Sequence, residues 1–198
     1  MEKKYNNDIN IIECGIDEAG RGPLFGNVYA AAVILDSNLI IPEKLIIDSK
    51  KLSKKKRKDA YEWIIQNVKN YAIGFATNEE IDTINILEAT KLAMERAINN
   101  LPIKPTHYII DGIGWEKKFN NLNATSIIKG DNKYFSIAAA SILAKESHDN
   151  HIKELIEKNN ELNNYDLINN MGYGTKKHIE AISKYGYSSY HRKSFIIK

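Results

Sequence analysis

Four acidic side chains stand where an apolar run of the sequence meets a glycine-containing turn: Asp17, Glu18, Asp111 and Asp131. Asp17 and Glu18 are adjacent, and neighbouring carboxylates repel each other unless a cation or strong hydrogen-bond donors lie between them. If the strands before these turns are neighbours in a sheet, all four carboxylates converge at one edge of it. Carboxylate oxygens without cysteine sulfur suit Mg²⁺ or Mn²⁺. The pattern therefore predicts a site for one of these divalent ions.

The turn that follows the first two acids carries further groups that could bind a ligand. Gly20 and Gly22 permit positive φ and a close approach of the backbone, while Pro23 fixes φ and removes a hydrogen-bond donor. Backbone amides beside Arg21 are what a sugar hydroxyl or a phosphate needs. The alternative interpretation is a strand that simply ends in a polar Gly-Pro turn.

Hydrophobic periodicity predicts the elements that must position these residues. It places strands at residues 11–16, 28–35, 71–77, 107–110 and 125–128, and helices from 54 onward, at 78–82, at 85–99, from 134 onward and at 176–184. This order favours an α/β layered domain with a mixed sheet. Successive side chains of a strand point to opposite faces, so the first strand must end or bulge at Asp17 and Glu18 if both are to reach metal.

Two polar residues are predicted to cap helices. Ser53 precedes the first helix, and Asn85 precedes the longer helix that runs to residue 99. Helical spacing on the first helix predicts that its apolar residues face the core: Tyr61, Trp63, Ile64, Ile65 and Val68.

Composition favours a globular chain with one domain. The 198 residues are 43% hydrophobic and 27% charged, with a formal net charge of +3, which is too mild to identify a nucleic-acid-binding protein. No apolar run is long enough to span a bilayer, and Met1 to Asp8 lacks an apolar signal core, so we expect a cytoplasmic protein without a membrane partner. The single cysteine, Cys14, is expected to pack as a small hydrophobe.

Basic residues crowd between positions 50 and 58, where seven of nine residues are lysine or arginine. Such a run is commonly a solvated helix start, but beside a carboxylate cluster it could also hold phosphates. His148 and His151 have a spacing that metal ligands use, yet no cysteine pair or third histidine supports zinc, and we expect both to be ordinary exposed helical histidines.

The stretch from Gly15 to Leu35, G-I-D-E-A-G-R-G-P-L-F-G-N-V-Y-A-A-A-V-I-L, resembles the opening signature of the bacterial ribonuclease HII family. The segments K-G-D with A-A-A-S-I-L-A-K, G-Y-G-T and Y-H-R-K-S-F match that family in the same order. The resemblance covers nearly the whole chain. It implies a ribonuclease H-like mixed sheet flanked by helices, with a helical C-terminal extension, in one catalytic domain spanning residues 1–198.

The resemblance also implies the chemistry. The family is an endoribonuclease that hydrolyses the RNA strand of RNA/DNA hybrids and cuts 5′ of single ribonucleotides in duplex DNA, leaving a 3′-hydroxyl and a 5′-phosphate. By resemblance, two Mg²⁺ or Mn²⁺ ions bind to Asp17, Glu18, Asp111 and Asp131. The substrate-binding residues implied are Gly20, Arg21, Gly22, Lys50, Asn85 and Tyr173. Apart from the resemblance, Asn85 is a helix cap and Tyr173 a structural turn tyrosine. We expect a monomer.

The sequence departs from the family pattern at four positions: Asn27, Ile113, His148 and Met171. The last two stand where basic residues are usual, so weaker phosphate contacts are expected there. No departure removes a metal ligand. The related type III enzyme matches less well, because it usually carries lysine at the position of Arg21 and an additional N-terminal domain.

Two other functions compete with this interpretation. The first is a metal-dependent DNA nuclease of the wider ribonuclease H-like group, such as a junction resolvase, against which the G-R-G turn argues. The second is a non-catalytic nucleic-acid-binding protein that uses the lysine-rich segment, with the acids merely structural. Mg²⁺ would add little to the nucleic-acid binding of such a protein.

Overall fold

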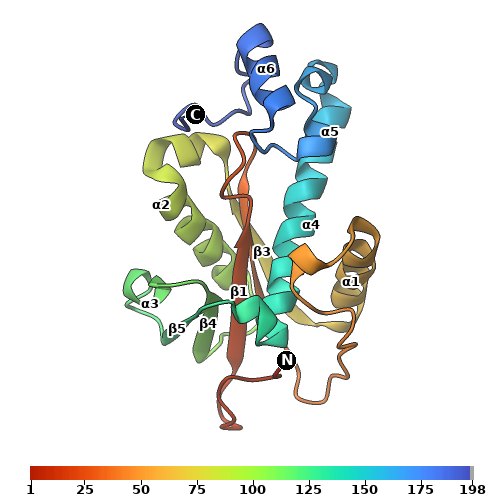
Figure 1. Cartoon of the computed structure of the whole chain (residues 1–198). Helices are drawn as coiled ribbons and strands as arrows, with labels where there is room; N and C mark the ends of the chain where they lie inside the picture. Colours follow the sequence, from red (N-terminus) through yellow and green to blue (C-terminus); the bar gives the residue numbers. More distant parts are fainter. Residues whose placement is uncertain (197–198) are drawn as a thin grey trace.

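A five-stranded mixed sheet in the order β3-β2-β1-β4-β5 forms the centre of the computed structural model, which describes residues 1–196 (Figure 1). The strands are β1 Glu13–Ala19, β2 Val28–Ile34, β3 Asn70–Ala76, β4 His107–Asp111 and β5 Ala124–Ile127. β1 pairs antiparallel with β2 and parallel with β4, and β5 is parallel to β4. The carboxyl ends of β1, β4 and β5 therefore lie at the same end of the sheet, as the acid pattern predicted.

Helices cover both faces of this sheet and extend beyond it. They are α1 Lys54–Asn67, α2 Asn78–Asn99, α3 Trp115–Lys118, α4 Phe135–Lys158, α5 Leu167–Asn170 and α6 Lys176–Tyr185, with short 3₁₀ turns at Ser49–Lys51, Gly130–Asn132 and Asn160–Tyr165. Figure 1 shows α2 on one side of the sheet and α1 and α4 on the other, with α5 and α6 beyond its end. The predicted order of elements and the helical C-terminal extension are confirmed.

The long helix α4 packs directly on β1 because small side chains line the contact. A Cβ atom on Gly15 would lie 2.5 Å from the carbonyl carbon and the Oγ of Ser136, so only glycine leaves room for the helix backbone at this crossing. Ala138, Ala139 and Ala140 are buried in the same contact layer. This close packing fixes α4 relative to the strand that carries Asp17.

The predicted start of α1 is confirmed, since the Ser53 side chain accepts a hydrogen bond from the backbone amide of Lys56. Ile64 and Val68 of this helix are buried, and Tyr61 and Trp63 pack partly against the same core. Ile65 is 38% exposed, so its predicted core position is wrong. It follows Ile64 by one residue, which turns it about 100° away from the buried stripe.

Asn85 interrupts α2 with a backbone that is not helical, at φ 67° and ψ 165°. Its Oδ1 accepts hydrogen bonds from the amides of Leu87 at 2.9 Å and Glu88 at 3.2 Å. Two helical segments therefore meet at this residue, and the predicted cap is confirmed.

Asn85→Ala is expected to destabilise the protein by about 1–3 kcal/mol. Alanine cannot form the capping hydrogen bonds, and it would have to keep a backbone conformation that favours glycine. Asn85→Gly loses the same cap but relieves the backbone, so its free energy of unfolding should stay closer to that of the wild type. Urea unfolding of the three proteins provides the measurement. An alanine variant as stable as the wild type would contradict the capping role.

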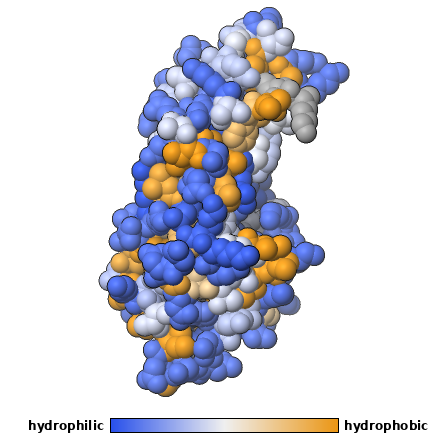
Figure 2. Space-filling view, turned by 90° about the vertical axis from the view of Figure 1, so that its left-hand side faces the viewer, coloured by the Kyte–Doolittle hydropathy of each residue, from blue (hydrophilic) through white to orange (hydrophobic). Residues whose placement is uncertain are grey.

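The face shown in Figure 2 is mostly hydrophilic, with several separate hydrophobic patches. Within residues 1–196, no helix has both the length and the apolar character needed to cross a membrane. The core lies on the two faces of the sheet, and the buried Cys14 packs within it, as predicted.

Candidate active site

The carboxyl ends of β1 and β4 bring Asp17 and Asp111 together. Ile16 and Ile110 pair in the parallel ladder, and each acid is the next residue of its strand. Asp111 Oδ1 accepts a hydrogen bond of 2.6 Å from the amide of Gly130, which holds the turn carrying Asp131 against β4. The predicted convergence of these three acids at one end of the sheet is confirmed.

The predicted end or bulge of the first strand at Asp17 and Glu18 is wrong. β1 continues to Ala19 in regular register, with Asp17 opposite Ala31 and Glu18 opposite Ala30 on β2. The ladder to β2 is longer than the apolar run indicated, because β2 offers small partners to both acids. Alternation directs the two side chains toward opposite faces at their first bond, yet the carboxylates stay close enough for the charge on Glu18 to raise the pKa of Asp17.

The two neighbouring acids consequently have different surroundings. Asp17 is 4% exposed and lies on the α4 side, where the nearby Ser141 hydroxyl lowers its pKa against the effect of burial. Glu18 Oε1 accepts a hydrogen bond of 3.1 Å from Arg21, whereas its Oε2 is buried and has no hydrogen-bond partner among the described residues. Glu18 thus retains one acceptor oxygen that nothing in residues 1–196 satisfies.

Burial and mutual repulsion raise the pKa of both acids. The pKa of Asp17 lies well above its usual range, because of burial first and then of the charges on Glu18 and Asp111. The pKa of Glu18 is also raised by burial, against the lowering effect of Arg21. A positive charge between these groups would relieve that cost.

Lys50 supplies one positive charge to the cluster. Burial alone would lower its pKa, but the fields of Asp17, Asp131, Asp48 and Asp111 outweigh burial and raise it. Its backbone is fixed by Asp48, whose carboxylate accepts a hydrogen bond of 2.9 Å from the Lys50 amide. Within the predicted basic run, Lys50 is the residue whose pKa these four aspartates raise.

Asp131 is held close to this segment through Asn132. The Asn132 side-chain amide donates to Asp131 Oδ1 at 2.8 Å and to Asp48 Oδ2 at 3.2 Å. Burial raises the pKa of Asp131, with further contributions from Asp111 and Asp48. Asn132 was not predicted as a site residue, although it directly follows the K-G-D segment.

The donor set fits a hard divalent cation in type and charge, since it consists of carboxylates, with raised pKa values at Asp17, Glu18 and Asp131 and one unsatisfied oxygen on Glu18. As the side chains stand, however, no group of three or more acids, histidines or cysteines within residues 1–196 is gathered closely enough to hold an ion. Arg21 and the Gly130 amide occupy one oxygen each of Glu18 and Asp111, respectively, and Glu18 Oε2 has no partner among the described residues.

A hollow of about 220 Å³ lies beside the acids and is lined by the glycine-arginine turn, Ser49, Lys50, Ser141, Lys145 and Tyr173. Tyr173 is 43% exposed, and its ring lies against Gly22, where an added Cβ would be 3.4 Å from Cε1. Tyr173 is therefore not a buried structural tyrosine. The hollow brings together four predicted substrate-binding residues of the turn and loop, namely Gly20, Arg21, Gly22 and Tyr173, with Lys50.

A second hollow of about 330 Å³ shares Glu18 and Arg21 with the first and extends past Asp111 to Leu87, Trp115 and Lys118. Of the four acids, Glu18 lines both hollows and Asp111 lines the second. Asn85 lines neither hollow and is exposed at the kink of α2, two residues before Leu87. The structure therefore brings every predicted site residue except Asn85 into this region.

Lys145 and Ser141 line the first hollow but were not predicted as site residues. Lys145 Nζ lies 5.7 Å from the centre of the Tyr173 ring, and Ser141 Oγ lies 3.0 Å from Ser49 Oγ. Both residues come from α4, within the segment A-A-A-S-I-L-A-K. Their spacing of four residues is the signal that could have placed them on one face of the helix.

His148 is 1% exposed, so its expected exposure is wrong. Its Nδ1 lies 3.0 Å from Asp149 Oδ1, and its ring packs against Gly20. Met171 is 7% exposed. Because side chains at both positions point into the protein, the expected loss of phosphate contacts at 148 and 171 is not supported.

Arg57 is also buried, which corrects its place in the predicted basic surface. Its guanidinium donates to Glu146 and, at 3.1 Å, to Asp149 Oδ2, while Asp149 Oδ1 contacts Lys145 and His148. A buried arginine needs such partners, because an unpaired charge in the interior is costly. Arg57 thus ties α1 to α4 and is not available to nucleic acid.

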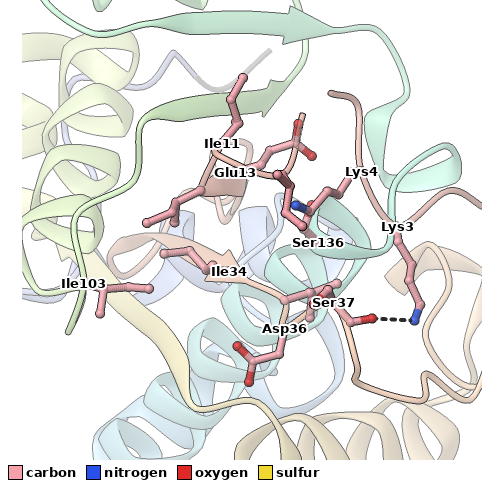
Figure 3. Close-up of a pocket in the computed structure, with 12 residues that line it drawn as sticks. Lys3, Lys4, Ile11, Glu13, Ile34, Asp36, Ser37, Ile103 and Ser136 are labelled. Carbon is pink, nitrogen blue, oxygen red and sulfur yellow. Dashed lines mark hydrogen bonds between the residues drawn. The ribbon is translucent and has the colours of Figure 1, made fainter. Parts of the chain in front are cut away.

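A separate cavity of about 190 Å³ lies at the opposite end of β1, beside the first residue of that strand, Glu13 (Figure 3). Lys3 borders it and donates a hydrogen bond of 3.2 Å to the Ser37 carbonyl, shown as a dashed line. Glu13 is already satisfied by the amides of Tyr5 and Asn6. This cavity is remote from the four acids and their turn.

Comparison with known proteins adds independent information. A family model described as ribonuclease HII matches residues 14–198. The chain is 52% identical to a ribonuclease HII of Rickettsia akari (strain Hartford), over 98% of this chain and 95% of that protein. It is 50% identical to a ribonuclease HII of Staphylococcus saprophyticus, over 92% of this chain and 68% of that protein.

Its fold is similar to that of the ribonuclease H2 from Pyrococcus horikoshii OT3. The two share 28% sequence identity with a TM-score of 0.72, over 92% of this chain and 93% of the other. The predicted ribonuclease H-like fold is thereby confirmed.

Proposed function

This chain belongs to the ribonuclease HII family and is a ribonuclease H, and we propose that it hydrolyses the RNA strand of RNA/DNA hybrids and cuts 5′ of single ribonucleotides in duplex DNA. The observation that carries the proposal is the hollow in which the glycine-arginine turn and the exposed Tyr173 meet beside the acids. Telling RNA from DNA requires contacts to the 2′-hydroxyl, and a turn with accessible amides next to a stacking ring suits that task. Residues 1–198 act as a single catalytic domain and as a monomer.

Asp17, Glu18, Asp111 and Asp131 are the proposed holders of the divalent ions on which this family depends, with two Mg²⁺ or Mn²⁺ ions in the substrate complex. When bound, such ions activate water and stabilise the departing 3′ oxygen of the phosphodiester, which leaves a 3′-hydroxyl and a 5′-phosphate. The fields of Asp17, Asp131 and Asp111 contribute to the raised pKa of Lys50, and Lys50 also lines the hollow. In the proposed complex, its ammonium holds a phosphate of the substrate.

The remaining roles belong to the recognition residues. Gly20, Arg21 and Gly22 bind the ribonucleotide sugar and its phosphate through backbone amides and the guanidinium. Tyr173 stacks on the sugar next to the cut bond, supported by Lys145 over its ring. Asn85, outside both hollows, contacts the nucleic acid farther along the duplex.

Cleavage of an end-labelled DNA duplex with one internal ribonucleotide tests the proposal, with the all-DNA duplex as its matched control. We expect one cut on the 5′ side of the ribonucleotide in Mg²⁺ or Mn²⁺, none in EDTA and none in the control. Equal cutting of both duplexes would favour the DNA nuclease instead. Metal-independent binding of both duplexes without any cut would favour the binding protein.

A further inference from the structure

Arg192 is fully buried, and its guanidinium donates all its hydrogen bonds to one turn. Its guanidinium donates to five backbone carbonyls, which belong to Gly20 at 2.7 Å, Arg21 at 3.2 Å, Pro23 at 2.8 Å, Gly26 at 2.8 Å and Asn27 at 3.0 Å. A guanidinium carries five N–H donors in a planar fork, and here each finds a carbonyl between residues 20 and 27. One side chain thereby determines the curvature of the whole glycine-arginine turn.

The preceding residue, His191, reaches the loop that carries Tyr173. His191 Nε2 lies 3.0 Å from His178 Nε2, and His178 Nδ1 lies 2.9 Å from the Tyr173 carbonyl oxygen. Since that carbonyl can only accept, His178 donates from Nδ1 and accepts at Nε2 from His191. His191 Nδ1 is then the acceptor for the Ser188 amide at 2.9 Å. The chain of hydrogen bonds is complete with both imidazoles neutral.

Backbone contacts place the same segment against both recognition elements. The Arg192 amide donates to the Leu24 carbonyl at 2.8 Å, and the Leu24 amide donates to the Gly172 carbonyl at 2.8 Å. A Cβ atom on Gly172 would lie 2.9 Å from the Phe25 carbonyl oxygen, so the loop approaches the turn as closely as glycine allows. The turn, the Tyr173 loop and the segment from Tyr190 to Phe195 form one packed unit.

This unit is anchored at a distance from the acids. Asp82 of α2 accepts hydrogen bonds from the Lys193 amide, the Ser194 amide and the Ser194 hydroxyl, at 2.9, 2.9 and 2.6 Å. Figure 1 shows the C-terminal end of the chain beside α2 and α6. Neither His191 nor Arg192 lines the two hollows beside the acids.

We propose that the C-terminal segment Tyr190 to Phe195 positions the ribonucleotide-reading surface, with Arg192 setting the glycine-arginine turn and His191 setting Tyr173 against it. Both are positioning residues that touch neither substrate nor metal. The proposal rests on the proposed function of that surface. It gives this segment a role in selectivity beyond closing the fold, because small displacements of recognition groups carry large costs in rate and binding.

The test compares two variants. Arg192→Lys keeps the charge but cannot donate to five carbonyls, and Asp82→Ala removes the hydrogen bonds that anchor Lys193 and Ser194 to α2. Asp59→Ala on α1 serves as the control, since Asp59 is exposed and remote. Binding is measured in EDTA, by anisotropy, to the duplex with one ribonucleotide and to the all-DNA duplex. Far-UV circular dichroism identifies which variants fold. We expect the ratio of the two affinities to fall on the order of tenfold or more in Arg192→Lys and less in Asp82→Ala, with no change in the control.

A double-mutant cycle with Tyr173→Ala separates positioning from general stability. If the segment acts through Tyr173 and the turn, Asp82→Ala should lower selectivity much less when Tyr173 is already absent. Folded variants with wild-type selectivity, or with equal losses for both duplexes, would overturn the inference and leave the proposed function intact. A wild type that binds the two duplexes equally would overturn the inference, whereas the proposed function fails only if the cleavage assay does not distinguish them.

Discussion

Asp17→Asn is expected to abolish metal-dependent cleavage and, at the same time, to raise the thermal midpoint of the protein in EDTA. Cleavage should fall on the order of 1,000-fold or more, because the substitution removes a charge that the proposed ions require. The gain in stability has a separate cause. Asp17 is buried beside Glu18 and Asp111, so its ionised form is costly in the folded protein.

The pH dependence of that cost fixes the sign of the effect. Burial and the neighbouring acids raise the folded-state pKa of Asp17 above its unfolded value, so the folded protein holds the proton more tightly. The wild type therefore loses stability as the pH rises through the window between the unfolded and the folded pKa. Asparagine cannot ionise, so the variant should lack this loss and exceed the wild type above that window.

Thermal unfolding from pH 4 to 8 in EDTA, together with cleavage in saturating Mg²⁺, provides the measurement. Asp59→Asn is the matched control, because Asp59 is exposed on α1 and should show neither effect. Mg²⁺ should raise the midpoint of the wild type more than that of the Asp17 variant, since a ligand stabilises only the state that binds it. Undiminished cleavage would remove Asp17 from the mechanism, and a lower midpoint in EDTA would contradict the electrostatic argument.

Local features of the site could be read from the sequence because short-range chemistry determines them. At the caps Ser53 and Asn85, a side-chain oxygen accepts a hydrogen bond from a backbone amide only a few residues away. Likewise, acids that follow apolar runs lie at strand ends, and parallel pairing of β1 with β4 brings Asp17 and Asp111 together.

Burial of charged residues could not be read in this way, because their partners are distant in the sequence. Arg57 finds its carboxylates about 90 positions away on α4, and Arg192 finds its carbonyls about 170 positions away in the turn. In the sequence, each arginine has basic neighbours, and such runs usually lie on the solvated surface. The continuation of β1 through Glu18 was missed for a related reason, since the ladder to β2 extends it beyond its apolar run.

Gly20→Ala is expected to lower cleavage at an embedded ribonucleotide on the order of 100-fold, through a displaced turn. Gly20 has φ of 88°, which alanine adopts only with strain, and its Cβ would lie 2.4 Å from His148 Cδ2 and 3.0 Å from the Asn27 carbonyl oxygen. His148 cannot withdraw, since it is 1% exposed and held by Asp149. The turn must move instead, and it carries Arg21 and the proposed recognition amides.

Gly186→Ala is the control that isolates this effect from backbone strain alone. Gly186 also has positive φ, at 79°, but no atom lies within 4 Å of an added Cβ, and it ends α6 away from both hollows. It should cost about 1 kcal/mol of stability and leave cleavage unchanged. Steady-state cleavage and urea unfolding of both variants distinguish the cases. If Gly20→Ala loses stability but cleaves like the control, the turn tolerates displacement and does not read the ribonucleotide. If cleavage falls far more in Gly20→Ala than in Gly186→Ala among protein that is folded, the geometry of the turn sets recognition.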